Sequence, residues 1–302
     1  MIVFVNGQFV PEAAATVSVF DRSFLYGDGL FETMRVANGK LFRWTQHMQR
    51  LERGAEFLGI KIPFGRGALA VFATEIVARN QLPDALLRLT LSRGVGVRGY
   101  STKGADHPTL VMSLHPIGAP NSDSARSERD GSEIGAPLRW RAHIARFRLP
   151  SGEAVAQFKT CNKLVQIIAR AEAEAAGADE ALLLNTDGFV VEAAAGNLFW
   201  IQDGTVCTPP ITGGVLAGVT RALVLELCAK LSVPCRESNI RPSELARMDA
   251  AFLSLSSHGI VELTAVDGVA LGSSAVAGRL HAAYLDLVRA ESTESFGDSP
   301  RD

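Results

Sequence analysis

Lys159 and Glu192 are the residues of this chain whose types and spacing most directly suggest chemistry. A lysine amine can hold an aldehyde cofactor covalently as a Schiff base. A carboxylate can pair with a pyridinium nitrogen, so that the ring withdraws electrons. Apolar residues at 154–158 and 164–168 place Lys159 near the edge of a core, where its pKa would fall. Taken alone, however, a lysine is usually a solvated surface charge, and Glu192 could be a strand-end charge facing water.

A phosphate-binding segment could lie at residues 216–221, directly before an expected helix over 222–231. Backbone N–H groups at the start of a helix bind phosphate when hydroxyls or a cation assist them. The same residues would also form an ordinary helix cap, which has the same structure without a ligand.

These residues together resemble the fold-type IV family of pyridoxal-phosphate enzymes, the class IV aminotransferases, over roughly residues 5–267. The resemblance is carried by Lys159-Thr-Cys-Asn-Lys-Leu164, by Glu192 and the small residues after it, and by Asn197-Leu-Phe-Trp200. It implies an α/β (α+β) fold of two domains, like that of D-amino-acid aminotransferases. It also implies pyridoxal 5'-phosphate as the cofactor.

The family pattern assigns roles to individual residues of this chain. Lys159 would bind the cofactor aldehyde and then move the substrate's α-proton. Glu192 would be the partner of the pyridine nitrogen, with the small residues 193–196 leaving room for a flat ring. The phosphate contacts would be Arg50, Val219, Thr220, Ser256 and Ser257. Arg50 without the resemblance would be read as an exposed helix charge.

The segment from Asp21 to Arg35 resembles the N-terminal signature of the same family. It should form a turn and a strand that line the substrate side of the site. Phe31, Thr33 and Arg35 are the candidate substrate contacts there. Asp21 and Asp28 are expected to form turns rather than to catalyse.

Residues 94–99 match GxGxxG and follow an expected strand, but a dinucleotide site would need a helix next. Residues 100–108 are not helical in pattern, so we reject that interpretation. Arg93 and Arg98 in this loop could instead grip a carboxylate, or they could belong to a basic surface turn.

The choice of reaction within the family depends on weaker signals. Branched-chain aminotransferases place a tyrosine five residues after the Schiff-base lysine, where this chain has Leu164. Well-known D-amino-acid aminotransferases use an Arg-x-His carboxylate trap, and residues 88–103 contain no such pair. Aminodeoxychorismate lyases often show Arg-Gly-x-Gly-x-Arg-Gly-Tyr-Ser, which this chain has at Arg93–Ser101.

The first hypothesis is therefore a 4-amino-4-deoxychorismate lyase that releases pyruvate and p-aminobenzoate, with Arg98 and Tyr100 holding a substrate carboxylate. The second is an aminotransferase acting on D-amino acids, branched-chain amino acids or amines with a 2-oxo acid. A third is a cofactor-binding protein without catalysis, against which Lys159 and Glu192 argue. The substrate would be a small amino compound, and the resemblance implies a homodimer.

Composition sets broader limits. The net charge of −2 suggests no grip on nucleic acid or an anionic membrane. No apolar span is long enough to cross a bilayer, and the N-terminus lacks the features of an export signal, so we expect a cytoplasmic protein. The four cysteines show neither zinc spacing nor a disulfide pattern, and we expect no metal. Cys161, beside Lys159, is expected to be a buried thiol rather than a nucleophile.

We expect an N-terminal α+β domain over residues 1–115 and a C-terminal cofactor-binding domain over 136–290. The first should contain a hairpin at Asn6-Gly7, helices at 47–58 and 68–79, and strands at 85–92 and 109–114. The second should contain helices at 163–176 and 221–231, with strands at 138–145, 180–185, 190–191, 197–202 and 250–255. Residues 116–135 should be an interdomain loop, either a solvated insertion or a loop that orders over a site. Residues 291–302 should be a disordered tail.

Overall fold

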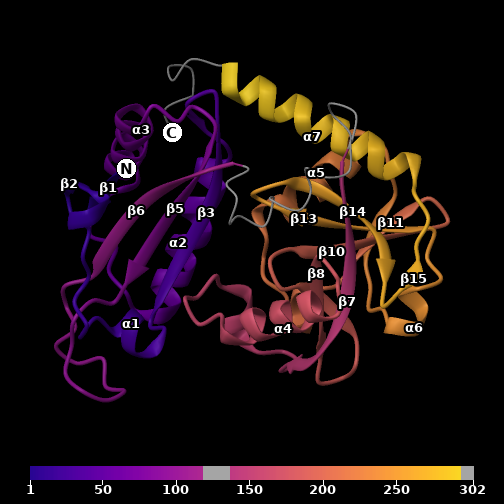
Figure 1. Cartoon of the computed structure of the whole chain (residues 1–302), viewed down its shortest axis with the longest axis horizontal. Helices are drawn as coiled ribbons and strands as arrows, with labels where there is room; N and C mark the ends of the chain where they lie inside the picture. The colour runs from indigo at the N-terminus through magenta and orange to yellow at the C-terminus, as the bar shows by residue number, and fades with distance from the viewer. Residues whose placement is uncertain (118–136, 294–302) are drawn as a thin grey trace.

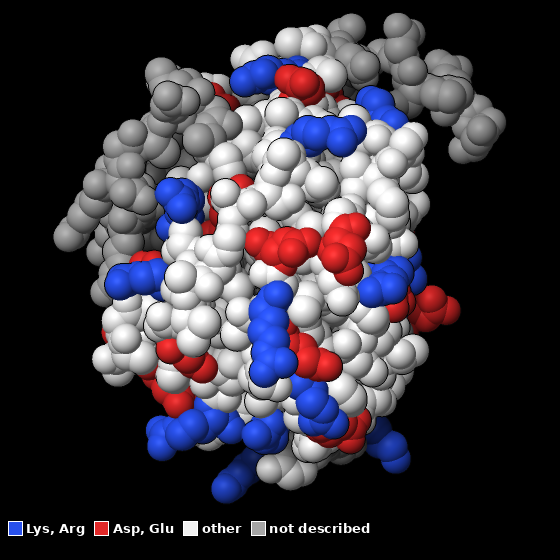
Figure 2. Space-filling view, turned by 90° about the vertical axis from the view of Figure 1, so that its right-hand side faces the viewer, with Lys and Arg blue, Asp and Glu red and all other residues white. Residues whose placement is uncertain are grey.

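The computed structural model of the chain describes residues 1–117 and 137–293, which form two β-sheets with helices packed on them (Figure 1). The expected interdomain loop lies outside the described residues, apart from its first two positions. No helix of the described part is both long enough and apolar enough to span a membrane. On the face shown in Figure 2, acidic and basic side chains are interspersed.

The N-terminal sheet is antiparallel and has the order β2-β1-β6-β5-β3-β4. Its strands are β1 (Ile2–Val5), β2 (Gln8–Pro11), β3 (Gly29–Ala37), β4 (Lys40–Leu41), β5 (Ala85–Ser92) and β6 (Thr109–Pro116). The predicted hairpin is present between β1 and β2. Asn6 and Gly7 turn with φ values of 49° and 94°, the left-handed conformations for which an Asn-Gly pair is suited.

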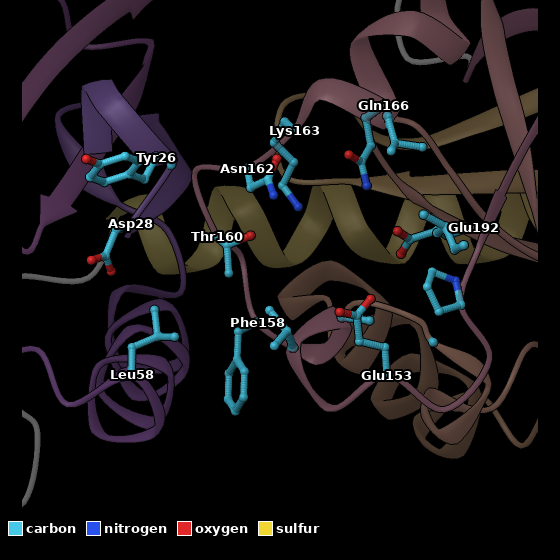
Figure 3. Close-up of a pocket in the computed structure, with 18 of the residues that line it drawn as sticks. Tyr26, Asp28, Leu58, Glu153, Phe158, Thr160, Asn162, Lys163, Gln166 and Glu192 are labelled. Carbon is cyan, nitrogen blue, oxygen red and sulfur yellow. The ribbon is translucent and has the colours of Figure 1, made fainter. Parts of the chain in front are cut away.

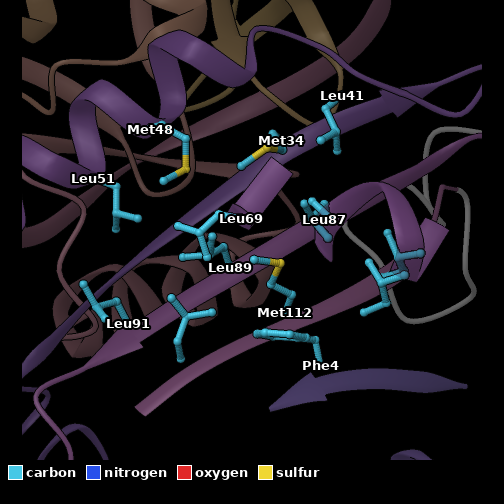
Figure 4. Close-up of a cluster of buried hydrophobic side chains, with 14 of the residues drawn as sticks. Phe4, Met34, Leu41, Met48, Leu51, Leu69, Leu87, Leu89, Leu91 and Met112 are labelled. Atoms are coloured by element: carbon cyan, nitrogen blue, oxygen red, sulfur yellow. The ribbon is translucent and has the colours of Figure 1, made fainter. Parts of the chain in front are cut away.

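One face of this sheet packs against α2 (Trp44–Leu58) and α3 (Arg66–Asn80) and forms the first core. Alternate residues of the strands supply it, among them Leu30 of β3. Figure 4 shows Met34 of β3 and Leu87 of β5 in this core. The opposite face of β3 therefore presents Phe31, Thr33 and Arg35. A short helix, α1 (Arg22–Tyr26), precedes β3, and its N-cap is Asp21, a turn former as expected.

The C-terminal sheet closes on itself, because β9 pairs with β8 on one side and with β10 on the other. The closed ring runs β10-β13-β14-β7-β8-β9. Its strands are β7 (Leu138–Leu149), β8 (Glu180–Asn185), β9 (Val190–Ala193), β10 (Asn197–Gln202), β13 (Ala250–Leu255) and β14 (Gly259–Val266). Strands β11 (Thr205–Thr208) and β12 (Cys235–Glu237) extend it beyond β10, and β15 (Val269–Ala270) pairs with β14.

Alternation along the ring strands separates an inner core from two outer ones. Leu198 and Trp200 of β10 belong to a cluster with Trp140 of β7, which fills the ring. Phe199 and Ile201 of the same strand point the other way, against α5 (Val219–Lys230) and α7 (Ala275–Thr293). Helix α4 (Leu164–Ala175) covers β7 and β8, and α6 (Pro242–Leu245) is a short turn. Three 3-10 helices complete the described elements: Glu12–Ala14, Ala154–Gln157 and Ile211–Gly213.

The structure corrects several expected element ends: α2 begins at Trp44 rather than at residue 47, and β7 continues to Leu149 rather than ending at residue 145. Two further corrections concern α7 and α5. Residues 291–293, expected in the disordered tail, instead continue α7, because Ser292 is buried and Glu291 pairs with Arg43 at 3.1 Å. Helix α5 begins at Val219, two residues earlier than expected, which brings Val219 and Thr220 into its first turn.

Candidate active site

A cavity of about 570 Å³ lies where the two sheets meet. It brings together most of the residues expected to form the site: Phe31, Thr33, Arg50, Lys159, Glu192, Val219, Thr220, Ser256 and Ser257. They come from β3, α2, the segment before α4, β9, the start of α5 and the turn after β13.

Lys159 is placed by a short stretch of strand pairing with β3. The Phe31 N–H donates to the Lys159 carbonyl at 2.9 Å, and the Cys161 N–H donates to the Gly29 carbonyl at 2.8 Å. Since successive side chains of an extended segment point to opposite sides, Lys159 faces the cavity. Its amine lies 4.6 Å from the centroid of the Phe31 ring.

Burial lowers the pKa of the Lys159 amine to about 7, and the positive charge of Arg50 adds to this effect. A substantial fraction of the amine is therefore neutral near pH 7, which is the form that reacts with an aldehyde or takes a proton. The neighbouring Cys161 differs: burial raises the pKa of its thiol, so it remains protonated and is a poor nucleophile.

Glu192 is buried on β9 and reaches the same cavity. Its Oε2 accepts a hydrogen bond from the Leu216 N–H at 2.9 Å, while no hydrogen bond to Oε1 occurs within the described residues. Burial raises the pKa of this carboxyl, and the Leu216 N–H and the ammonium groups of Lys163 and Lys159 oppose that rise. A buried carboxylate oxygen without a hydrogen-bond partner can accept a hydrogen bond from a protonated ring nitrogen.

Position 196, in the run of small residues after Glu192, has no room for a side chain. A Cβ atom on Gly196 would lie 2.8 Å from the Leu255 side chain and 2.9 Å from the Ser254 carbonyl oxygen. Ala193, Ala194 and Ala195 also line the cavity, which leaves a smooth wall beside Glu192.

The segment expected to bind phosphate lies at the N-terminus of α5, where backbone N–H groups lack helical partners. The Thr220 and Ser256 hydroxyls lie 3.3 Å apart there. Gly218, the residue before the helix, packs so closely that a Cβ would approach Asn197 Oδ1 to 2.0 Å. Asn197 in turn donates to the Leu216 carbonyl at 2.9 Å, which fixes the loop against β10.

Arg50 reaches this loop from the N-terminal half and donates to the Ala217 carbonyl at 3.1 Å. Two residues that the sequence pattern did not single out hold it: Glu32, in a bidentate pair, and His47, bonded to Glu32. Lys163 was also missed, although it is four residues from Lys159, lines the cavity and lies near Glu192.

Three expected substrate contacts lie outside the cavity of their own chain. Arg35 borders a small gap behind the phosphate loop, beside His47 and Val219. Arg98 and Tyr100 are exposed, and 89% of the Tyr100 surface is accessible. Arg93 is also not free for a ligand, because it is buried and bonded to Asp28 and to the Leu58 and Gly59 carbonyls. No helix follows the Gly94–Gly99 loop, in agreement with the rejected dinucleotide site.

A second cavity, of about 320 Å³, lies on the other side of the segment that carries Lys159. Phe158, Thr160 and Asn162 line it, as the alternation along the segment requires. In Figure 3 Lys163 and Gln166 point into it from the side of α4, and Glu192 borders it from β9. Lys163, Gln166 and Glu192 thus belong to the walls of both cavities.

The donor set fits pyridoxal phosphate. An amine with a pKa of about 7 suits its aldehyde, the buried Glu192 carboxylate suits its ring nitrogen, and the α5 N-terminus with Arg50 suits its phosphate. Gly196 in the cavity wall and Gly218 before α5 lie at positions where a Cβ atom would clash with neighbouring residues.

Comparisons with known proteins identify the family of the chain. The family model for amino-transferase class IV matches residues 29–266. A putative branched-chain-amino-acid aminotransferase of Methanocaldococcus jannaschii is 32% identical, covering 91% of each chain.

Among solved structures, the branched-chain aminotransferase of Thermoproteus uzoniensis has a TM-score of 0.86 at 27% identity, covering 97% of this chain and 96% of that one. The 4-amino-4-deoxychorismate lyase of Pseudomonas aeruginosa has a TM-score of 0.79 at 32% identity, covering 94% of this chain and 98% of that one. The chain therefore belongs to the class IV aminotransferase family, the pyridoxal-phosphate-dependent enzymes of fold type IV.

Proposed function

We propose that this enzyme is a 4-amino-4-deoxychorismate lyase, which releases pyruvate and p-aminobenzoate. The observation that carries the proposal is the Arg93–Ser101 sequence, which matches the pattern of such lyases over its whole length. The similarity to the Pseudomonas aeruginosa lyase supports it.

The cavity has a basic side chain that the cofactor would leave for the substrate. The substrate carries two carboxylates, and Lys163 lines the cavity in addition to Arg50 and Lys159, which the cofactor would engage. The Lys163 side chain makes no hydrogen bond within the described residues, so it is available to an anionic ligand. Burial lowers the pKa of its amine, and the charge of Glu192 opposes that effect.

The bound cofactor supplies an electron-withdrawing ring that stabilises negative charge at the substrate carbon. Lys159, as a neutral amine, would take the proton from the substrate ring carbon that bears the amino group. Glu192 keeps the ring nitrogen protonated while the charge develops. The C–O bond at the neighbouring carbon would then break, and the proton held by Lys159 would pass to the methylene carbon of the departing enolpyruvate, so that pyruvate leaves and the carbon ring becomes aromatic. No amino acceptor is needed.

Arg98 and Tyr100 remain candidates for holding a substrate carboxylate, although they are exposed in their own chain. We propose that the enzyme is a homodimer in which this loop serves the cavity of the partner subunit. The exposed apolar residues Val95 and Val97 in the same loop, and Phe24 on the adjacent α1, support a contact with a second copy.

An aminotransferase is the second candidate, supported by the similarity to branched-chain aminotransferases over nearly the whole chain. Lys159 would perform the same proton removal and would also be the group that returns the proton. The choice between the two reactions therefore depends on cavity residues other than Lys159 and Glu192.

The deciding experiment measures p-aminobenzoate release by the cofactor-loaded protein, with aminodeoxychorismate generated in place from chorismate and an amine source. Release that stops in Lys159→Ala would support the lyase. No release, together with conversion of the cofactor to its pyridoxamine form by L- or D-amino acids, would reject the lyase in favour of the aminotransferase.

A further inference from the structure

We propose that Glu32 and His47 are positioning residues for the phosphate end of the cofactor site, and that they lock the Arg50 guanidinium in its phosphate-binding orientation. The inference rests on the phosphate role proposed for Arg50. Glu32 and His47 lie on the opposite side of β3 from Phe31 and Thr33, and neither lines the main cavity.

Glu32 holds Arg50 through two parallel hydrogen bonds. Its Oε1 accepts from Arg50 Nε at 2.8 Å, and its Oε2 accepts from Nη2 at 2.6 Å. Both side chains are buried, with 1% of Glu32 and 5% of Arg50 exposed. A bidentate pair of this kind fixes the plane of the guanidinium as well as its position.

His47 fixes the carboxylate in turn. It lies one turn before Arg50 on α2, and its Nδ1 is 2.7 Å from Glu32 Oε2. Burial lowers the pKa of His47 against the opposing influence of Glu32, so a neutral ring donates the Nδ1 proton. His47 therefore orients Glu32 without adding charge beside Arg50.

Within the described residues, this arrangement leaves two N–H groups of Arg50 without a partner, and Arg50 lines the cavity. A guanidinium has five N–H groups. Arg50 donates three of them, two to the Glu32 carboxylate oxygens and one to the Ala217 carbonyl. One N–H on Nη1 and one on Nη2 remain. Because Ala217 directly precedes Gly218 and the first turn of α5, Arg50 is held against the loop whose N–H groups would bind the same phosphate.

Two effects of Glu32 on phosphate binding oppose each other. Its negative charge repels a phosphate dianion, so on charge alone its removal would tighten binding. Its hydrogen bonds order the Arg50 side chain before phosphate binds, so binding does not have to supply that conformational entropy. Considering orientation alone, removal of Glu32 would therefore weaken phosphate binding. We expect the effect on orientation to be the larger. Whether replacing Glu32 lowers or raises the affinity for pyridoxal phosphate shows which effect dominates.

The test compares the affinity of the cofactor-free protein for pyridoxal phosphate with its affinity for pyridoxal, which lacks the phosphate. We expect Glu32→Gln and the charge-conserving Glu32→Asp to weaken pyridoxal phosphate binding by about 10- to 100-fold, the scale of a charged hydrogen bond. Pyridoxal binding should be unchanged. Glu52→Gln is the matched control, because Glu52 grips Arg66 in the same two-bond geometry away from the cavity.

Arg50→Ala separates this inference from the proposal on which it rests. It should produce the same phosphate-specific loss, and Glu32→Gln should then cause no further loss in that background. Tighter pyridoxal phosphate binding by Glu32→Gln, or equal weakening for both ligands, would overturn the positioning role alone. If Arg50→Ala leaves the ratio of the affinities for pyridoxal phosphate and pyridoxal unchanged, the phosphate role of Arg50 is overturned as well. The release of p-aminobenzoate tests the lyase proposal independently.

Discussion

Lys159 owes its reactivity to its surroundings, because burial and the charge of Arg50 lower its pKa to about 7. Only the neutral amine reacts with an aldehyde, and its fraction grows as pH rises through the pKa. We therefore expect the rate at which the cofactor-free protein captures pyridoxal phosphate to rise roughly tenfold from pH 6 to pH 8. Rapid-mixing absorbance of the cofactor measures this rate. A rate that keeps rising towards pH 10 would indicate an ordinary solvated lysine.

Glu192 contributes a charge that cannot be replaced by a neutral side chain of the same shape. We expect Glu192→Gln to bind pyridoxal phosphate and to attach it to Lys159, yet to lose about 100-fold or more in turnover, because the ring nitrogen loses its anionic partner. Cofactor absorbance and steady-state rates measure the two properties separately. Glu153→Gln, at the exposed rim of the second cavity, is the control and should be neutral. Turnover within a few-fold of wild type in Glu192→Gln would contradict the role.

At the level of elements, sequence reasoning succeeded where the signal is local. The Asn6-Gly7 hairpin and strands β5, β10 and β13 lie where alternation and turn residues predict them. The closure of the C-terminal ring through β9 depends on pairings that no local pattern reveals. Helix α7 was also missed, although its buried residues at Ala277, Leu280, Tyr284 and Val288 recur at helical spacing.

The site shows the same division. Lys159, Glu192 and the expected phosphate loop could be named as candidates because the family resemblance marks short, contiguous motifs, and the structure places them around one cavity. Glu32 could not be named in this way, because a charge between apolar residues of a strand looks like a solvent-facing position. Only the packing of α2 on β3 shows that it is buried and paired. The positions of Arg98 and Tyr100 outside their own cavity also could not be read from sequence, because spacing does not tell which subunit a loop serves.

The junction between Gly218 and α5 is the element whose geometry tolerates least change. A Cβ at position 218 would lie 2.0 Å from Asn197 Oδ1, so the loop must shift. We expect Gly218→Ala to destabilise the protein by about 1–3 kcal/mol, as overpacking does, and to weaken pyridoxal phosphate binding more than pyridoxal binding. Gly278→Ala is the control, since position 278 is helical with nothing within 4 Å and should gain about 0.5–1 kcal/mol. Denaturant unfolding and cofactor titration measure both. A stable Gly218→Ala with wild-type affinity would contradict the close packing.

At the level of the whole molecule, the exposed Arg98 loop and the cavity of its own chain are separate units. If the loop completes the cavity of a partner subunit, two inactive variants can restore one another. Lys159→Ala has a disabled cavity and an intact loop, whereas Arg98→Ala has the reverse. A mixed dimer then contains one complete site, so co-refolded variants should recover roughly a quarter of wild-type activity if the subunits combine at random.

The mixture of Lys159→Ala and Arg98→Ala also tests the alternative, in which Arg98 serves the cavity of its own chain. If Arg98 serves its own chain, the mixed dimer has one cavity without Lys159 and one without a working loop, and no activity returns. Refolding each variant alone is the control, and size-exclusion chromatography shows whether dimers have formed. Activity that returns only in the mixture would assign the loop to the partner subunit, and with it the carboxylate specificity of the site would become a property of the dimer. Dimers without restored activity would remove Arg98 from the partner's site.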